Sequence, residues 1–581
     1  YSGLIELKDV TTINYFDCTK NLVKLKRWLT SKKKIKNYAY LIFCLSIIFF
    51  TSCTKKTIFS DENLAQFSES VNPKDIRRHI SVLADDSLKG RLPGTPEYDK
   101  AMAYVANRYK EFGLKPFGNK QESTFYQTLT LRNSVVNNKQ SFMILNDTDS
   151  LQVGIDYFYF GNANEVLTEF SGKLVIAGYG IQAPEYGFND FKNLDVKGKI
   201  VVIFLGAPSS LPASERAYFS NIATKITTLD NLGAEGFLLA TEPDGSSLFS
   251  GFYNRMKDQG LESVLMPNGK ALGMSDYGAH LKFGGFFNWS TLSKLTGLTD
   301  ENWWNYNKND GELNQPSKAI YLKGKVISKF KEFESANVIG LLEGGKLKDE
   351  YIVHTAHLDH IGIGKLVDGD SIYNGAHDNA SGISAMLEIA RLYSKLPSKP
   401  KRSVLFAAVT AEEMGLLGSK YLAVNPPVEQ QKIIANVNTD MPTLIAPLFS
   451  VEPLGAEQSS IMEVVKRSAK QLHLKIDPDH APEEVRFVRS DNFNFVLEGI
   501  PALRMKAGLK TETSDKGLDS LMKAFTEQYY HKPSDELNGG MFNFDAAKTY
   551  VRLQFMNSYL INVSEEKPTW NEDSFFKKFE K

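Results

Sequence analysis

Residues 403–415 read SVLFAAVTAEEMG, in which an uncharged, largely apolar run at 403–411 is followed by two neighbouring glutamates. The apolar part indicates a buried β-strand. Short apolar runs at 351–354 and 433–437 predict two more strands, and apolar side chains at helical spacing predict a helix over 383–396 between the first two. Because strands and helices alternate, we predict an α/β fold with a mixed, mostly parallel sheet flanked by helices.

Side chains that bind metals follow each of the three predicted strands. His357 follows the first strand, Glu412 and Glu413 the second, and Asp440 the third. In open α/β sheets the reactive groups gather beyond the carboxyl ends of the strands. We therefore expect these side chains to lie close together.

The histidine motif has two interpretations. In an extended backbone, residues two apart point the same way, so Asp359 can approach the His357 ring and fix its tautomer. Taken alone, this common spacing is better explained by a surface hydrogen bond. We expect His354 to be a strand residue and His360 to face outward.

The acidic motifs also have simpler explanations. Asp378 lies in the run NGAHDNASG at 374–382, where an aspartate often caps a helix. Glu412 and Glu413 suit the first turn of a helix, although two adjacent carboxylates after an apolar strand are costly to bury without a cation. We expect His377 to point away from any metal.

Asp440 and His531 would each pass for an ordinary loop residue. The argument rests on the ordered combination, which supplies a carboxylate that can bridge two cations, enough further ligands, and a spare carboxylate to take a proton from water. The cysteines are Cys18, Cys44 and Cys53, so the rest of the chain offers only imidazole and carboxylate ligands.

The bulk composition is that of a globular protein. A chain of 581 residues predicts two or three domains. Lys+Arg and Asp+Glu both total 68, giving a formal net charge of zero. Since nucleic-acid binding favours a basic surface, the composition gives no reason to expect a nucleic-acid partner.

The N-terminus predicts an export signal. Lysines at 32–36 precede an apolar stretch at 38–50, which is shorter than the roughly 20 residues of a membrane span. Cys53 follows shortly after this stretch, and the pattern resembles a bacterial lipoprotein signal, with a plain signal peptide or an uncleaved anchor as alternatives. We expect residues before about 30 to precede the true start of the chain.

The metal motifs, together with KGRLPGT at 89–95, resemble metallopeptidase family 28. This two-zinc aminopeptidase group is related to glutamate carboxypeptidase, glutaminyl cyclase and the transferrin receptor. Gly178-Tyr179-Gly180 and DVKGK at 195–199 resemble the protease-associated domain that is often inserted in this family. The predicted organisation is a leader (1–53), a tether (54–72), the first part of a zinc exopeptidase-like catalytic domain (73–164), a β-rich α+β protease-associated insert (165–328), the rest of the catalytic domain (329–565) and a tail (566–581).

The resemblance implies a role for each site residue. Asp378 would bridge two Zn²⁺ ions, with His357 and Asp440 completing one shell and Glu413 and His531 the other. The remaining roles are Glu412 as general base, Asp359 as the residue that orients His357, Tyr530 as a stabiliser of the tetrahedral intermediate, and Arg489 and Asp491 on the substrate side. Asn492 departs from the family, in which many members have histidine there.

The resemblance implies a metallo-exopeptidase that acts on peptides. An aminopeptidase that hydrolyses N-terminal peptide bonds is the main interpretation. A carboxypeptidase or dipeptidase of the same fold, an acyl transferase similar to glutaminyl cyclase, and a binding protein with an inactive site are the alternatives. The lipoprotein pattern implies an exported protein held on a bacterial membrane by a lipid anchor at Cys53.

Overall fold

The computed structural model describes residues 59–119, 123–274, 276–309, 313–539 and 541–581. The predicted leader, Cys53 and the start of the predicted tether lie outside these residues. Residues Phe59–Lys581 form one compact unit. Within this described part, no helix combines the length and apolar character needed to cross a bilayer.

The centre of the catalytic region is a mixed sheet with four neighbouring parallel strands. Their order is β18 (Arg402–Val409), β15 (Leu347–His357), β19 (Ile433–Asn438) and β22 (Ala502–Ala507). Antiparallel strands extend both ends of the sheet: β14 (Tyr321–Leu342) and β2 (Tyr126–Val136) beyond β18, and β20 (Ser450–Leu454) beyond β22. The predicted strands at 351–354, 403–409 and 433–437 and the α/β fold are confirmed.

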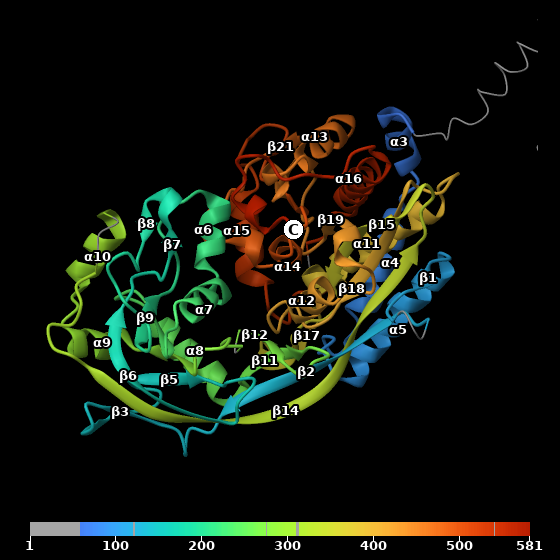
Figure 1. The fold of residues 1–581 in the computed structure, drawn as a ribbon. Helices are drawn as coiled ribbons and strands as arrows, with labels where there is room; N and C mark the ends of the chain where they lie inside the picture. Colours follow the sequence, from blue (N-terminus) through green and yellow to red (C-terminus); the bar gives the residue numbers. More distant parts are fainter. Residues whose placement is uncertain (1–58, 120–122, 275, 310–312, 540) are drawn as a thin grey trace, which may run out of the picture. The chain divides into compact units, whose positions relative to one another are not determined.

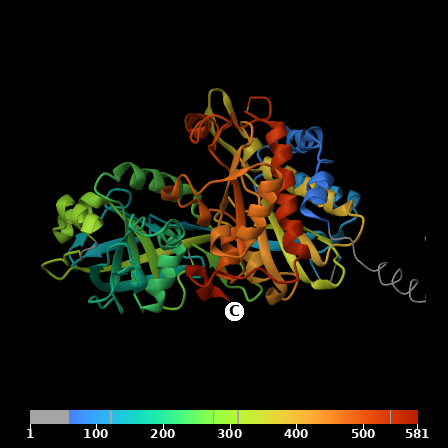
Figure 2. The same ribbon diagram turned by 90° about the horizontal axis from the view of Figure 1, so that it is seen from above.

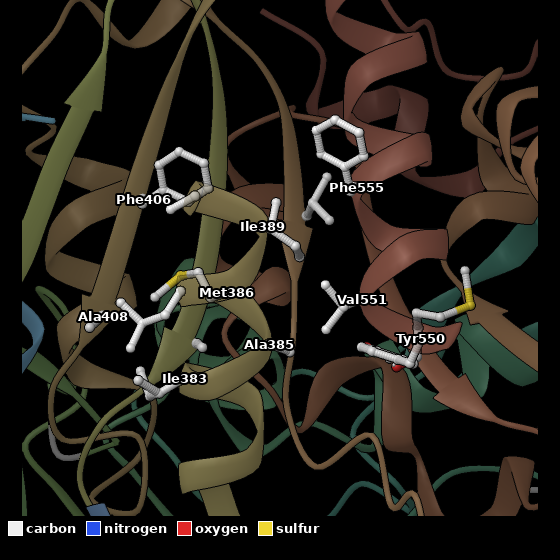
Figure 3. Close-up of a cluster of buried hydrophobic side chains, with 14 of the residues drawn as sticks. Ile383, Ala385, Met386, Ile389, Phe406, Ala408, Tyr550, Val551 and Phe555 are labelled. Atoms are coloured by element: carbon white, nitrogen blue, oxygen red, sulfur yellow. Dashed lines mark hydrogen bonds between the residues drawn. The ribbon is translucent and has the colours of Figure 1, made fainter. Parts of the chain in front are cut away.

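Helices cover both faces of this sheet. Side chains alternate along β18, so neighbouring residues pack against helices on opposite faces. Phe406 and Ala408 belong to a core with α11 (Ser381–Ser394) and α16 (Phe544–Val563), as Figure 3 shows. Leu405 and Val409 belong to a separate core that also contains residues of the helices on the other face. Those helices are α12 (Leu417–Val424) and α14 (Asn492–Leu497).

The N-terminal helices pack on the same face as α16. They are α3 (Asp61–Ser68), α4 (Pro73–Leu83) and α5 (Pro96–Glu111). The blue N-terminal helices lie beside the red helix α16 in Figure 2, and both α3 and α4 contact α16. Leu64 of α3 is completely buried, so the helix belongs to the core of this unit.

A second, β-rich region has its own sheet. Strand β6 (Leu167–Ile176) pairs in parallel with β9 (Ile200–Phe204), and β10 (Gly236–Ala240) pairs in parallel with β9 and with β13 (Phe283–Phe287). Strand β5 (Tyr157–Phe160) pairs with β13 in the antiparallel direction. The helices of this region are α6 (Ala213–Ser220), α7 (Ile222–Asn231), α8 (Ser246–Gln259), α9 (Trp289–Thr296) and α10 (Asp300–Asn309).

One long strand, β14, belongs to both sheets (Figure 1). It pairs with β6 over residues 321–327, with β2 over 328–338 and with β18 over 338–342. Short strands complete the pairing: β1 (Lys115–Pro116), β3 (Phe142–Leu145), β4 (Asp149–Ser150), β7 (Gln182–Ala183), β8 (Phe188–Asn189), β11 (Leu261–Leu265), β12 (Ala271–Gly273), β16 (Gly362–Val367), β17 (Asp370–Tyr373) and β21 (Lys475–Ile476). The remaining helices are α13 (Ile461–Gln471) and α15 (Asp519–Gln528). The domain boundaries predicted at 165 and 328 remain predictions.

His354 lies in β15, as predicted, and makes the fold sensitive to acid. Its side chain is completely buried, stacks on Phe406 and contacts the Ser558 hydroxyl at 2.7 Å. Burial lowers the pKa of His354 to about 3. The ordinary histidine pKa is about 6.5, so below that pH the unfolded chain binds a proton that the folded chain excludes.

The lowered pKa of His354 predicts how its substitution changes the pH dependence of stability. Between about pH 6.5 and about pH 5, the free energy of unfolding of His354→Gln should fall by about 1.5 kcal/mol less than that of the unsubstituted protein. Urea titrations at the two pH values measure the difference. His473→Gln, which changes an exposed histidine, should follow the unsubstituted protein. Equal acid sensitivity of His354→Gln and the unsubstituted protein would contradict the assignment.

Candidate metal centre

The parallel strands bring the predicted ligands to one edge of the sheet. His357 is the last residue of β15, and Glu413 and Asp440 follow the ends of its neighbours β18 and β19. Asp378 lies in the turn at Ala376–Ala380 that leads into α11, and His531 follows α15. The structure therefore gathers side chains from five separate segments.

The distances define two groups that share Asp378. His357 Nε2 lies 3.2 Å from Asp378 Oδ1 and 3.5 Å from Asp440 Oδ1. His531 Nε2 lies 3.2 Å from Asp378 Oδ2 and 3.3 Å from Glu413 Oε2. Asp378 thus turns one oxygen toward each group, which is the arrangement of a bridging carboxylate.

These spacings fit zinc. Zinc binds nitrogen and oxygen ligands at about 2.0–2.2 Å, so two ligands of a tetrahedral shell lie about 3.3–3.6 Å apart. The donor atoms of His357, Asp378 and Asp440 all lie within 4.8 Å of one another. Clustered buried carboxylates also need a positive charge. The residues present therefore fit a zinc centre in both donor type and spacing.

Charge within the cluster sets the protonation of the imidazoles. Burial disfavours the cationic form of His531, but Asp378 and Glu413 outweigh it and raise the pKa of His531 to about 10. Because a ligating imidazole must be neutral, a metal ion has to displace this proton. Metal affinity at His531 therefore depends on pH.

Asp359 supports the site differently from the predicted arrangement. His357 Nδ1 lies 3.2 Å from the backbone carbonyl of Asp359, not from its carboxylate. The Asp359 carboxylate accepts the backbone N–H groups of Glu412 at 3.1 Å and Glu413 at 3.2 Å. The side chain of Asp359 thus fixes the acidic turn, while its backbone contacts His357.

Glu412 and Tyr530 line a cavity of about 520 Å³ together with the metal residues. Burial raises the pKa of Glu412 well above its ordinary value; His357 opposes this shift, and Glu413 and Asp440 add to it. The Tyr530 ring stacks on His531 at 4.0 Å, and burial raises the pKa of Tyr530. Glu412 is therefore a carboxyl that holds a proton readily, and Tyr530 is a hydroxyl donor.

The two predicted substrate residues lie in different environments. Arg489 is exposed and lines the cavity. Asp491 is completely buried, is not among the lining residues, and its pKa is raised by burial to about 7. Asn492 is also buried and donates a hydrogen bond to the Phe487 carbonyl at 3.0 Å.

The expectation for His360 was wrong. The side chain is completely buried, and its Nδ1 lies 2.7 Å from Glu413 Oε1. His377, by contrast, stacks on Phe542 with a centroid separation of 3.7 Å, consistent with a place outside the metal shell. The sequence HLDH at 357–360 carries no signal that distinguishes an inward-facing His360 from an outward-facing one.

Sequence reasoning also missed two residues that hold the metal loops. Buried Arg91 donates to the backbone carbonyls of Leu358 at 2.8 Å and Gly375 at 3.0 Å. The Asp535 carboxylate accepts the backbone N–H of Asp378 at 3.0 Å. Arg91 lies in the KGRLPGT motif and Asp535 lies four residues after His531, but neither position in the sequence indicates the partner.

Comparison of the sequence with known proteins finds a peptidase family and two aminopeptidases among the matches. Residues 337–552 match the model of peptidase family M28. The chain is 37% identical over 136 residues to aminopeptidase YwaD of Bacillus subtilis (strain 168), a match that covers 23% of this chain and 27% of that protein. It is 30% identical over 137 residues to aminopeptidase NAALADL1 of Mus musculus, covering 23% and 17%. The chain thus spans less than a third of the length of these curated relatives.

Solved structures show a more distant likeness. The aminopeptidase from Aneurinibacillus sp. strain AM-1 gives a TM-score of 0.45 at 18% identity, covering 88% of this chain and 97% of that chain. BSAP, a zinc aminopeptidase from Bacillus subtilis, gives 0.40 at 19% identity, covering 85% and 96%. TM-scores this low identify neither fold nor function by themselves.

The family match covers the segment that carries every predicted metal residue, and the geometry of those residues fits zinc. Residues 337–552 therefore carry both the match to the model of peptidase family M28 and the candidate metal site.

Proposed function

We propose that this protein is a zinc-dependent aminopeptidase that hydrolyses N-terminal peptide bonds with two Zn²⁺ ions. The observation that carries this proposal is the position of Asp378, which directs one oxygen to His357 and the other to His531. The family match and the two curated relatives, both named aminopeptidases, support it.

Each side chain of the centre has a role in the proposed reaction. His357, Asp378 and Asp440 would hold one zinc ion, and His531, Asp378 and Glu413 the other. Bound zinc polarises the scissile carbonyl and makes water more acidic. Glu412 takes the proton of the attacking water and passes it to the leaving amine.

Two neighbours assist these residues. Tyr530 lines the same cavity and keeps its proton, so its hydroxyl can donate to the oxyanion that forms from the carbonyl. Arg504 forms an ion pair with Asp440 Oδ2 at 2.7 Å and leaves Oδ1 toward His357.

The complete set of five ligands favours hydrolysis over an inactive binding site.

We further propose that the β-rich region is a protease-associated domain. Its own mostly parallel sheet supports this, as do Gly178 and Gly180, both with positive φ, beside Tyr179. Superposition of this sheet on solved protease-associated domains checks the assignment.

The lipoprotein-type motif leads to a proposal about location. We propose that Cys53 carries a lipid that anchors the exported protein to a bacterial membrane, with the peptidase outside the cytoplasm. The support is the order of basic region, apolar stretch and cysteine in the sequence.

The anchor predicts a membrane-bound protein whose location depends on one residue. In a bacterial host, the unsubstituted chain should sediment with membranes, and mass spectrometry of its N-terminal peptide should show acyl chains on Cys53. Cys53→Ala should release the peptidase from the lipid anchor, whereas Cys44→Ala, inside the apolar stretch, should not. An unmodified Cys53 in membrane-bound protein would overturn the proposal.

Metal removal and a blocked substrate together test the proposed activity. A chelator should abolish hydrolysis of a peptide with a free amino terminus, and zinc should restore it. The same peptide with an acetylated amino terminus should be cleaved at least about tenfold more slowly, because an aminopeptidase needs the free amine. Mass spectrometry of the products identifies the bond. Faster cleavage of the acetylated peptide would favour a carboxypeptidase or an endopeptidase.

Substitution of the general base should separate catalysis from metal binding. Glu412→Gln should lower turnover by about 10²–10⁴-fold because the amide cannot accept a proton. Zinc content should not change, since Glu412 is not a predicted ligand. Glu463→Gln, on the exposed surface of α13, is the control and should retain full activity. Normal turnover in Glu412→Gln would refute the assignment.

A further inference from the structure

A third imidazole lies at the metal centre besides the two predicted ligands. His360 follows the end of β15, and its ring centroid lies 5.8 Å from that of His531. Its Nδ1 is 2.7 Å from Glu413 Oε1, and its side chain is completely buried. One donor atom each of His360, Asp378 and Glu413 also lie within 4.8 Å of one another, so His360 could be a metal ligand or a hydrogen-bond partner of Glu413.

The distance between His360 Nδ1 and Glu413 Oε1 distinguishes a hydrogen bond from ligation of one metal ion by both residues. The four pairs of predicted ligand atoms are 3.2–3.5 Å apart, as expected for two atoms bound to one zinc ion. The separation of 2.7 Å between His360 and Glu413 is shorter and is that of a charge-assisted hydrogen bond. An ionised carboxylate only accepts, so His360 Nδ1 carries the proton and donates it.

The two oxygens of Glu413 therefore have different partners. Oε1 accepts the His360 N–H, whereas Oε2 faces His531 Nε2 at 3.3 Å. Asp440 shows the same division, since Oδ2 pairs with Arg504 at 2.7 Å and Oδ1 faces His357 at 3.5 Å. Each terminal carboxylate thus has one oxygen held by a side-chain donor and one left for the metal.

The backbone leaves room for the His360 ring. Gly375 has a φ of +59°, and a Cβ built on it would lie 2.6 Å from His360 Cδ2. The His360 backbone N–H donates to the Arg91 carbonyl at 3.3 Å. His360 Nε2 is buried and has no hydrogen-bond partner among the described residues. The ring is therefore fixed by the residues packed around it and by its hydrogen bond to Glu413.

We propose that His360 is a positioning residue that makes Glu413 a one-oxygen ligand of the metal site it shares with His531. By holding Oε1, His360 orients Oε2 toward the ion and lowers the cost of ordering the carboxylate. The inference rests on the proposed two-zinc function. It also predicts that the site of His357 and Asp440 does not depend on His360.

Zinc affinity measured without substrate tests this role. Apo forms of the full chain are titrated with zinc against a chromophoric chelator, which gives the number of sites and their affinities. His360→Leu should keep one tight site and bind the second ion about 10–100-fold more weakly. His360→Asn, whose amide places an N–H near the position of Nδ1, should recover most of this loss.

A matched control removes a different buried histidine. His354→Leu changes a side chain of β15 that contacts Ser558 and should bind both ions as the unsubstituted protein does. Circular dichroism confirms that each variant is folded. Unchanged affinities in His360→Leu would overturn the inference, and so would an asparagine variant no better than the leucine variant. Binding of fewer than two ions by the unsubstituted protein would instead refute the proposed function on which the inference rests.

Discussion

The structure of this centre depends on the electrostatic cost of placing several carboxylates side by side. Glu412, Glu413, Asp378 and Asp440 meet at one edge of a sheet, where all four line one cavity and Asp378 and Asp440 are buried. Like charges at this range favour protonation or separation unless a cation lies between them. Divalent ions would satisfy this requirement, and the histidine–carboxylate spacings of 3.2–3.5 Å fit zinc.

A ring of hydrogen bonds holds the ligands in place around that cation site. Asp359 binds the backbone of the acidic turn, and Asp535 binds the backbone that carries Asp378. Arg91 joins an N-terminal segment to the loops that follow β15 and precede α11. Each of these contacts joins a charged side chain to backbone groups, which fixes the position of a loop without using the ligand atoms of the metal residues.

The long strand β14 connects this chemistry to the second region of the molecule. It pairs with the outermost parallel strand of the catalytic sheet and, over other residues, with the β-rich sheet. Continuous strand pairing restricts relative movement more than a flexible linker does, because backbone hydrogen bonds must break for the regions to separate. The relative positions of the two regions therefore depend on the strand pairing along β14.

The sequence by itself determined the alternating strands and helices and the order of the metal residues at the strand ends. It also indicated a peptidase of family M28, and the family match and the gathered ligands agree with this. Only the tertiary structure decided how Asp359 and His360 act. Two-residue alternation holds within a regular strand, but β15 ends at His357. Beyond it the chain turns, so Asp359 reaches the acidic turn and His360 points inward. The space that Gly375 leaves for His360 comes from a segment distant in sequence, and no local pattern encodes such a contact.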